Sequence, residues 1–229
     1  MPIYNAPLAA VDAKETRRYA GLAKADFDEA VIREACEEAA LLAAPRGVWQ
    51  RYAYDCQRQT VSGEDVVLPG TAIGRHLAGC EAVICLAATV GEAIEEAVTR
   101  HFQEGRYAYS TILDAAATAA VEQTADALER AIRPTTAKEG LHTRWRFSPG
   151  YGDWPLTGQP DMVRLSGAAE IGIRLTESLM LLPRKSITAI IGLSRDTAVP
   201  AAPHGCDACP RTDCPARQAR AEGTKPNIW

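Results

Sequence analysis

Three features are missing from this chain of 229 residues, and each absence excludes a class of protein. Basic residues are not in excess, because 29 acidic side chains against 25 Lys and Arg leave a net charge of −4. That balance argues against nucleic acid as a partner, since phosphate backbones are bound by basic surfaces. No apolar run approaches the roughly 20 residues of a membrane helix. The N-terminus lacks the layout of a signal peptide, so we expect a cytoplasmic protein with no membrane partner.

The composition is that of a soluble globular protein, with 47 % hydrophobic and 24 % charged residues. A chain of this length forms one large domain or two small ones. The clear break in composition lies near residues 199–203, which are rich in Pro and Ala and precede a Cys-rich segment. We therefore expect a main domain over residues 1–198 and a separate tail over residues 199–229.

Two long helices are predicted from apolar residues at helical spacing. The first covers residues 26–42, and the second covers residues 107–133 and ends at Pro134. The second contains a run of small side chains at 115–120, which lets another backbone or a flat ligand approach closely. Glu122 lies beside this apolar stripe, where a carboxylate is ordinarily a solvated surface charge.

Short apolar segments on either side of these helices predict strands. Residues 48–56 and 81–87 have the composition of strands, and residues 178–182 and 186–193 predict a hairpin near the end of the domain. Early strands, central helices and a late hairpin predict an α+β fold, a twisted antiparallel sheet with flanking helices.

Residues 144–155 are the segment on which the functional interpretation centres. They combine aromatics, two Pro and two Gly, a composition that predicts an ordered loop and excludes a helix. A glycine such as Gly150 permits positive φ or close approach of a ligand to the backbone. The loop displays Arg146 and Tyr151, and its composition suits a small-molecule site as well as a stiff turn packed by its aromatics.

The tail contains Cys206, Cys209 and Cys214 in the spacing C-x2-C-x4-C. Clustered Cys in a reducing compartment are typical of metal or cluster ligands. Two thiolates separated by two residues can hold one metal ion or one edge of a cluster, so the spacing predicts a zinc site or an iron–sulfur cluster. The fourth ligand stays open, and the candidates are His204, Cys56, Cys80, Cys85 and an unfilled position.

The segment Arg146–Tyr151, followed by Pro155, resembles the R-P-A-P-G-Y-x-x-C-P signature of the activation domain of cobalamin-dependent methionine synthase. Two further segments resemble that family: Leu175–Ser178 with Pro183 and Ser186–Thr188 is similar to L-T-E-S…P…S-V-S, and Glu122–Arg133 is similar to E-x-x-A-E-x-L-x-x-x-x-R. The resemblance covers about residues 70–195 and includes no corrinoid, folate or homocysteine module. The chain looks like a free-standing activation domain with a Cys-rich tail added.

The resemblance implies an S-adenosylmethionine-binding accessory protein for a methyltransferase. It implies that Arg146 binds the ligand's carboxylate and Glu122 its ammonium group. Ser148 and its neighbour Gly150 would offer backbone groups to the adenine or to the amino-acid part. Tyr151 is the implied catalytic residue facing the corrin. The partner would be a corrinoid-binding methionine synthase or another corrinoid protein, which carries cobalamin and is reactivated by reductive methylation. The implied electron donor is a flavodoxin or a ferredoxin.

The sequence of this chain also departs from the family's pattern in three places. Trp154 replaces the family's Cys, Leu156–Gln159 replaces an acidic stretch, and the usual aromatic pair has no counterpart in Asp196–Val199. The Cys-rich tail supports a second hypothesis, an iron–sulfur activator that delivers the electron to a corrinoid protein. The missing aromatic pair supports a third, a docking module that has lost its ligand site.

Overall fold

A computed structural model describes residues 2–195, so Cys206, Cys209 and Cys214 lie outside the described residues. The helices are α1 (Ala13–Tyr19), α2 (Glu29–Leu42), α3 (Thr71–His76), α4 (Ala93–Gln103), α5 (Tyr107–Lys138) and α6 (Gln159–Ser166), with 3-10 turns η1 (Leu156–Gly158) and η2 (Ala168–Ile171). The strands are β1 (Ile3–Tyr4), β2 (Arg46–Asp55), β3 (Thr60–Val61), β4 (Val66–Val67), β5 (Ala82–Thr89), β6 (His142–Thr143), β7 (Arg174–Leu175), β8 (Leu181–Leu182) and β9 (Ser186–Ser194).

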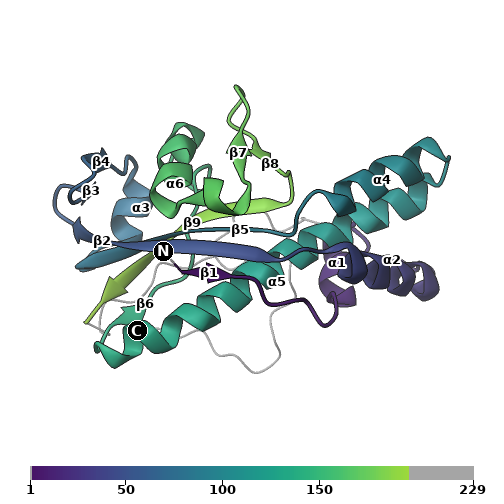
Figure 1. Ribbon diagram of the computed structural model, residues 1–229, viewed down its shortest axis with the longest axis horizontal. Coiled ribbons are helices and arrows are strands. Elements are labelled where there is room, and N and C mark those ends of the chain that lie inside the picture. The colour runs from purple at the N-terminus through teal and green to yellow at the C-terminus, as the bar shows by residue number, and fades with distance from the viewer. Residues whose placement is uncertain (1, 196–229) are drawn as a thin grey trace.

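A seven-stranded sheet in the order β4-β3-β2-β5-β9-β6 forms the centre of the molecule, and β1 joins it at β2. Every pairing in this sheet is antiparallel. The long strands are in register over their whole lengths, with Arg46 opposite Thr89 and Ala82 opposite Leu193. Helices cover both faces (Figure 1), which confirms the α+β prediction.

Strand β5 shows why the sheet is covered on both faces. All eight of its residues are buried, and successive side chains point to opposite faces because a strand alternates with a period of two. Ile84 and Leu86 pack with Leu128 and Ile132 of α5, whereas Cys85 on the opposite face belongs to the same core cluster as residues of α3 and α6. The loop at 144–155 lies on the second of these faces.

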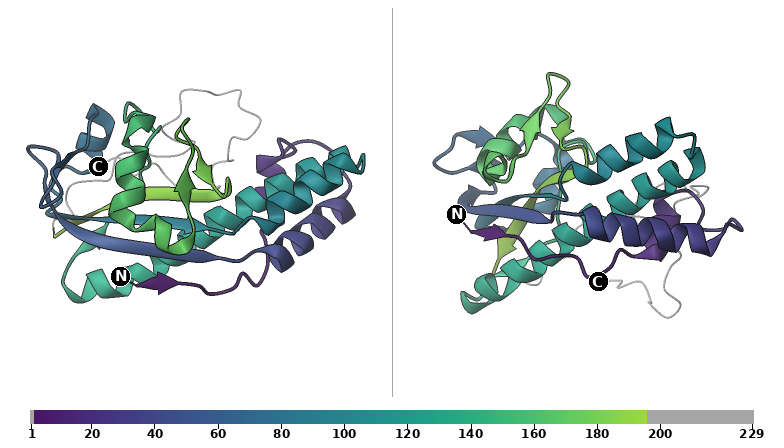
Figure 2. Two further views of the ribbon diagram at one scale, coloured as in Figure 1. Left: turned by 45° about the horizontal axis from the view of Figure 1, so that its top comes forward. Right: turned by 45° about the vertical axis from the view of Figure 1, so that its right-hand side comes forward.

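Helix α5 connects the sheet to a group of helices at one end of the molecule. Its C-terminal half lies against the sheet, and its N-terminal half packs with α1, α2 and α4 (Figures 1 and 2). The predicted run of small residues at 115–120 lies in the N-terminal half. Ile32 and Ala35 of α2 and Ile94 of α4 belong to the same core cluster as residues of this run. The small side chains therefore allow neighbouring helices to pack closely against α5 at this point.

The predicted hairpin between 178–182 and 186–193 is wrong. Strand β9 lies between β5 and β6, so neighbours occupy both of its edges. Strand β8 pairs instead with β7 in a separate two-stranded sheet, and a turn at Thr176–Leu179 joins those two strands. Alternating apolar residues indicate a strand but do not specify which edge it pairs with.

Helix α5 does not end at Pro134, contrary to the sequence prediction, but continues to Lys138. A proline removes one backbone hydrogen bond from a helix interior. Ile132 and Thr136 on either side of it are buried, so packing of the last turn offsets that loss. No helix within residues 2–195 is long and apolar enough to cross a membrane.

Candidate functional site

The loop at 144–155 begins as an extension of the sheet. The backbone N–H of Phe147 donates to the carbonyl of Ile190 in β9 at 2.9 Å, and the N–H of Ile190 donates back at 2.8 Å. The chain then turns tightly, with the Gly150 N–H donating to the Trp154 carbonyl at 2.8 Å and the Tyr151 N–H donating to the Ser148 carbonyl at 3.1 Å. The loop is thus ordered by its own backbone, as its composition predicts.

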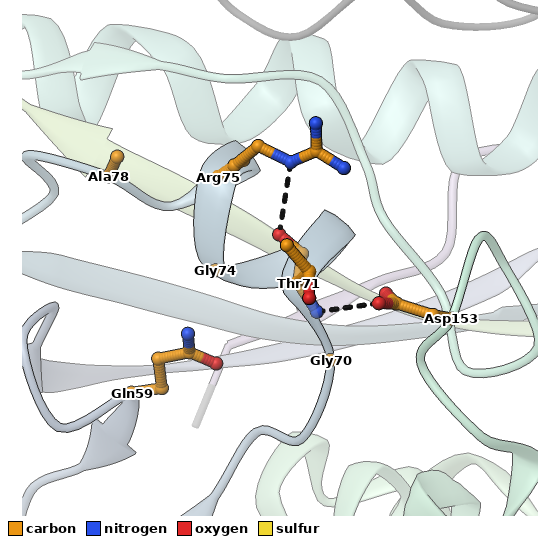
Figure 3. A pocket seen from close by; sticks show the side chains of 7 residues that line it. All are labelled: Gln59, Gly70, Thr71, Gly74, Arg75, Ala78 and Asp153. Atoms are coloured by element: carbon orange, nitrogen blue, oxygen red, sulfur yellow. Dashed lines mark hydrogen bonds between the residues drawn. The ribbon is translucent and has the colours of Figure 1, made fainter.

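A carboxylate fastens the far end of this loop to α3. One oxygen of Asp153 accepts the backbone N–H of Thr71 at 2.7 Å (Figure 3), and the other accepts the backbone N–H of Ala72 at 2.8 Å. These hydrogen bonds lower the pKa of Asp153, because they favour its ionised form. Gly152 has φ +56°, and a Cβ there would lie 2.8 Å from that of Ala72, so the close approach requires glycine.

A hollow of about 440 Å³ adjoins this fastening and opens widely to solvent. Figure 3 shows its lining residues around α3, with Asp153 pointing at the first turn of the helix. The polar groups there bond to one another: Asp153 holds the Thr71 amide, and Arg75 donates to the Thr71 carbonyl. The hollow therefore lies where the loop is anchored to α3, and Asp153 and Thr71 are engaged in that anchoring.

Trp154, the position where the resembled family has Cys, is a core residue. Its side chain is fully buried and its ring stacks on that of Phe147 at 6.2 Å between centroids. It also shares a core cluster with Met162 and Leu165 of α6. Gly158 makes room for the indole, because a Cβ at that position would lie 2.7 Å from the indole nitrogen. The loop is therefore anchored to the core by the large apolar side chain of Trp154.

Arg146 lies among three carboxylates of α5, which we call the charged cluster: Glu122, Asp126 and Glu129. The guanidinium nitrogens lie 3.3 Å from Glu122, 2.7 Å from Asp126 and 3.1 Å from Glu129. These carboxylates raise the pKa of Arg146 against the opposing effect of burial. Three contacts use three of the five N–H donors of the guanidinium, so two remain for another acceptor.

Electrostatics within the charged cluster favour an additional cation. Burial raises the pKa of Glu122 above its ordinary value of 4.5, and Arg146 only partly opposes that shift. One guanidinium faces three carboxylates, although Arg133 also pairs with Glu129 at 2.6 Å. A positively charged ligand group beside Glu122 would compensate this half-buried carboxylate.

A neutral cleft of about 240 Å³ lies next to Tyr151. Four segments form it: the loop from Ser148, the start of η1 and α6, the turn leading into β8, and the first residues of β9. Its lining consists of Ser148, Pro149, Tyr151, Leu156, Gln159, Leu179, Met180, Leu181, Arg184, Ser186, Ile187 and Thr188.

Tyr151 connects the two regions. Its side chain lines the neutral cleft and is half exposed, while burial and then the charge of Glu122 raise the pKa of its phenol, with Arg146 opposing. The phenol thus lies within electrostatic reach of the charged cluster. A ligand with a charged end and an uncharged end could extend along this side chain.

Of the predicted site residues, the structure brings Glu122, Arg146 and Tyr151 together. Ser148 joins Tyr151 in lining the neutral cleft. Gly150 takes φ +89° at the turn, and its amide is used by the Trp154 carbonyl, so its contribution is the shape of the loop.

Sequence reasoning missed three residues of the site, Asp126, Glu129 and Thr188. The two carboxylates carried a signal, because positions 122, 126 and 129 have the spacing that places side chains on one face of a helix. Thr188 belongs to the segment Ser186–Thr188 that resembles the family, but nothing in the sequence indicated that its buried hydroxyl makes no hydrogen bond within residues 2–195.

No cluster of metal-ligating side chains occurs within residues 2–195. Of the Cys proposed as fourth ligand to the tail, Cys80 and Cys85 are buried, and Cys56 is half-buried. Burial raises the pKa of the Cys85 thiol, which disfavours the thiolate that a metal requires.

Comparison with known proteins gives a structural likeness. A scan against family models finds no match, and a search of curated proteins finds no relative. The crystal structure of the MetH reactivation domain bound to AdoHcy matches 86 % of this chain and 80 % of that chain, with a TM-score of 0.58. This chain has the fold of the MetH reactivation domain. At 16 % sequence identity the likeness establishes the reactivation-domain fold, and any further argument rests on the site residues.

Proposed function

We propose that this chain binds S-adenosylmethionine and supports reductive methylation of a corrinoid cofactor carried by a partner protein. One observation carries the proposal. Within the segments that resemble the activation domain of methionine synthase, Arg146 pairs with Glu122 at 3.3 Å, and Ser148, Tyr151 and Ser186–Thr188 line one cleft. The related domain of known structure was solved with AdoHcy, the product left when S-adenosylmethionine gives up its methyl group.

The chemistry of the site fits this ligand. S-adenosylmethionine carries an ammonium, a sulfonium and a carboxylate on one end and an uncharged nucleoside on the other. Glu122 supplies a half-buried carboxylate for a cationic group, and Arg146 retains two donors for the ligand's carboxylate. The neutral cleft beyond Tyr151 supplies apolar walls and hydroxyl groups for the nucleoside.

The contribution of this chain to the reaction would be position. The corrinoid is a substrate held by the partner, and once reduced it attacks the methyl carbon while the carbon–sulfur bond breaks, leaving a neutral thioether. Residues of this chain hold the methyl donor and orient its sulfonium toward the cleft opening, where Tyr151 is exposed. Fixing two reactants in a productive geometry lowers the barrier without acid–base chemistry.

Calorimetry with S-adenosylmethionine tests the binding step, and the visible spectrum of a cobalt(II) corrinoid protein with reductant tests methylation. Tyr151→Ala should lower the rate of methylation at least tenfold, whereas Tyr107→Ala should not. The two side chains have similar exposure, 53 % and 59 %, but Tyr107 lies at the start of α5 against Phe102. Absence of binding heat with the wild-type chain would refute the proposal. Binding to the corrinoid protein that ignores S-adenosylmethionine would instead support a docking module.

The Cys-rich tail supports an additional function that is compatible with the first. We propose that Cys206, Cys209 and Cys214 ligate an iron–sulfur cluster or zinc, on the basis of their spacing. A cluster would carry the electron that a flavodoxin or ferredoxin delivers. Anaerobic purification with analysis of iron, sulfide and zinc decides between the two, and zinc alone would make the tail structural.

A further inference from the structure

The floor of the neutral cleft contains a buried hydroxyl that lacks a partner. Thr188 of β9 lines the cleft and is 3 % exposed, and its hydroxyl makes no hydrogen bond within residues 2–195. Its neighbour Ser186, which also lines the cleft, is satisfied, because its hydroxyl lies 2.9 Å from that of Thr89. A buried polar group without a partner destabilises a protein, so its presence at a cleft indicates a ligand group that completes it.

The rest of the cleft shows what kind of ligand group this is. Its lining is apolar or uncharged except for Arg184, which is already paired with Glu95 at 3.1 Å. A zwitterion would gain no charged partner there, whereas a flat heterocycle with polar edges would find apolar walls and the buried hydroxyl of Thr188. The volume of about 240 Å³ lies below the roughly 300 Å³ at which pockets enclose a whole drug-sized ligand. The cleft therefore suits part of a large ligand.

We propose that Thr188 hydrogen-bonds the nucleoside part of the ligand and that the site is divided at Tyr151. The neutral cleft recognises the nucleoside, and the charged cluster around Arg146 recognises the amino-acid end. This inference rests on the proposed function, because it assigns the two ends of a ligand of the S-adenosylmethionine type. A threonine hydroxyl both donates and accepts, so it can pair with a ring nitrogen, an exocyclic amine or a ribose hydroxyl.

The division of the site predicts that Thr188→Val raises the thermal stability of the chain and weakens its binding of the nucleoside. Thr188→Val keeps the shape of the side chain and removes the hydroxyl. It should raise the melting temperature of the ligand-free chain, because an unsatisfied buried group is lost. It should also weaken binding of 5′-methylthioadenosine, which contains the nucleoside without the amino-acid end, at least tenfold. Binding of methionine, which contains the other end, should not change.

Two variants control this experiment. Thr188→Ser keeps the hydroxyl and should bind 5′-methylthioadenosine within about threefold of the wild type. Thr136→Val removes an equally buried hydroxyl, also at 3 % exposure, that already donates to the Arg133 carbonyl at 3.0 Å. It should lower the melting temperature and leave ligand binding unchanged.

The outcomes separate this inference from the proposed function. Equal binding of 5′-methylthioadenosine by wild type and Thr188→Val, with S-adenosylmethionine binding intact, would overturn the assignment of Thr188 alone. Failure of the wild-type chain to bind S-adenosylmethionine would overturn the proposed function. A weaker complex with Thr188→Val, together with its raised melting temperature, would support both.

Discussion

The charged cluster and the neutral cleft lie on either side of Tyr151 and are built in different ways. In the charged cluster, Arg146 is held by carboxylates spaced along one face of α5, and every partner is a charged side chain. In the neutral cleft, the walls come from four segments, and the buried hydroxyl of Thr188 has no hydrogen-bond partner within residues 2–195. The comparison shows that one region is preorganised by its own contacts, whereas the other is the region that we propose a ligand completes.

The two regions also depend on different supports. The neutral cleft rests on Trp154 and on the fastening of Asp153 to α3. The charged cluster rests on the rigidity of a single helix. Substitutions that remove one support should therefore damage one region more than the other.

The largest effect should come from removing the support of the neutral cleft. Trp154→Ala deletes a fully buried aromatic and should lower the free energy of unfolding by about 3–5 kcal/mol, measured in urea. Binding of 5′-methylthioadenosine should be lost, since the loop above Trp154 forms one wall. Phe102→Ala, a change at an exposed aromatic, should cost less than about 1 kcal/mol. Similar losses in the two variants would show that the loop does not depend on Trp154.

A smaller effect is expected from removing the cation of the charged cluster. Breaking a buried ion pair from one side costs about 3–5 kcal/mol. Solvent reduces that figure for Arg146→Ala, because Glu122 is 37 % and Asp126 53 % exposed, so we expect about 2 kcal/mol by urea unfolding.

Arg51→Ala is the matched control for that experiment, because it breaks an exposed pair with Glu139 at 2.5 Å and should cost less than about 1 kcal/mol. In Arg146→Ala, binding of methionine should weaken more than binding of 5′-methylthioadenosine. The reverse order would contradict the division of the site.

The smallest effect concerns the protonation of Glu122. Its pKa is raised in the folded chain, mainly by burial, so its contribution to stability is fully present below pH 4.5 and is lost as pH rises through the raised pKa. A bound cation favours the ionised carboxylate, so affinity for S-adenosylmethionine should rise with pH through that same range and then level off.

Glu122→Gln tests this linkage directly. Calorimetry at several pH values should give a nearly flat profile for the variant. Its affinity at pH 7 should be about tenfold below that of the wild type, equivalent to about 1.4 kcal/mol. A variant with the same pH profile as the wild type would assign the titration to another group.

Much of the fold was predictable because periodicity reports local burial. The long helices and the strands around 48–56 and 81–87 follow from the spacing of apolar residues, and both occur in the structure. The pairing of β8 was not predictable, since the edge that a strand meets depends on which other strands already occupy the sheet. The continuation of α5 beyond Pro134 likewise depends on packing of its last turn.

The sequence by itself determined the α+β class, the ordered loop and, through a resemblance, the grouping of Glu122, Arg146 and Tyr151. Those features follow from residue type and spacing, which are local properties. Only the tertiary structure decided that Asp126 and Glu129 share Arg146, that Trp154 supports the loop, and that Thr188 is left without a partner. The physical reason is that the partner of a polar or charged side chain is a group that the fold brings from elsewhere in the chain.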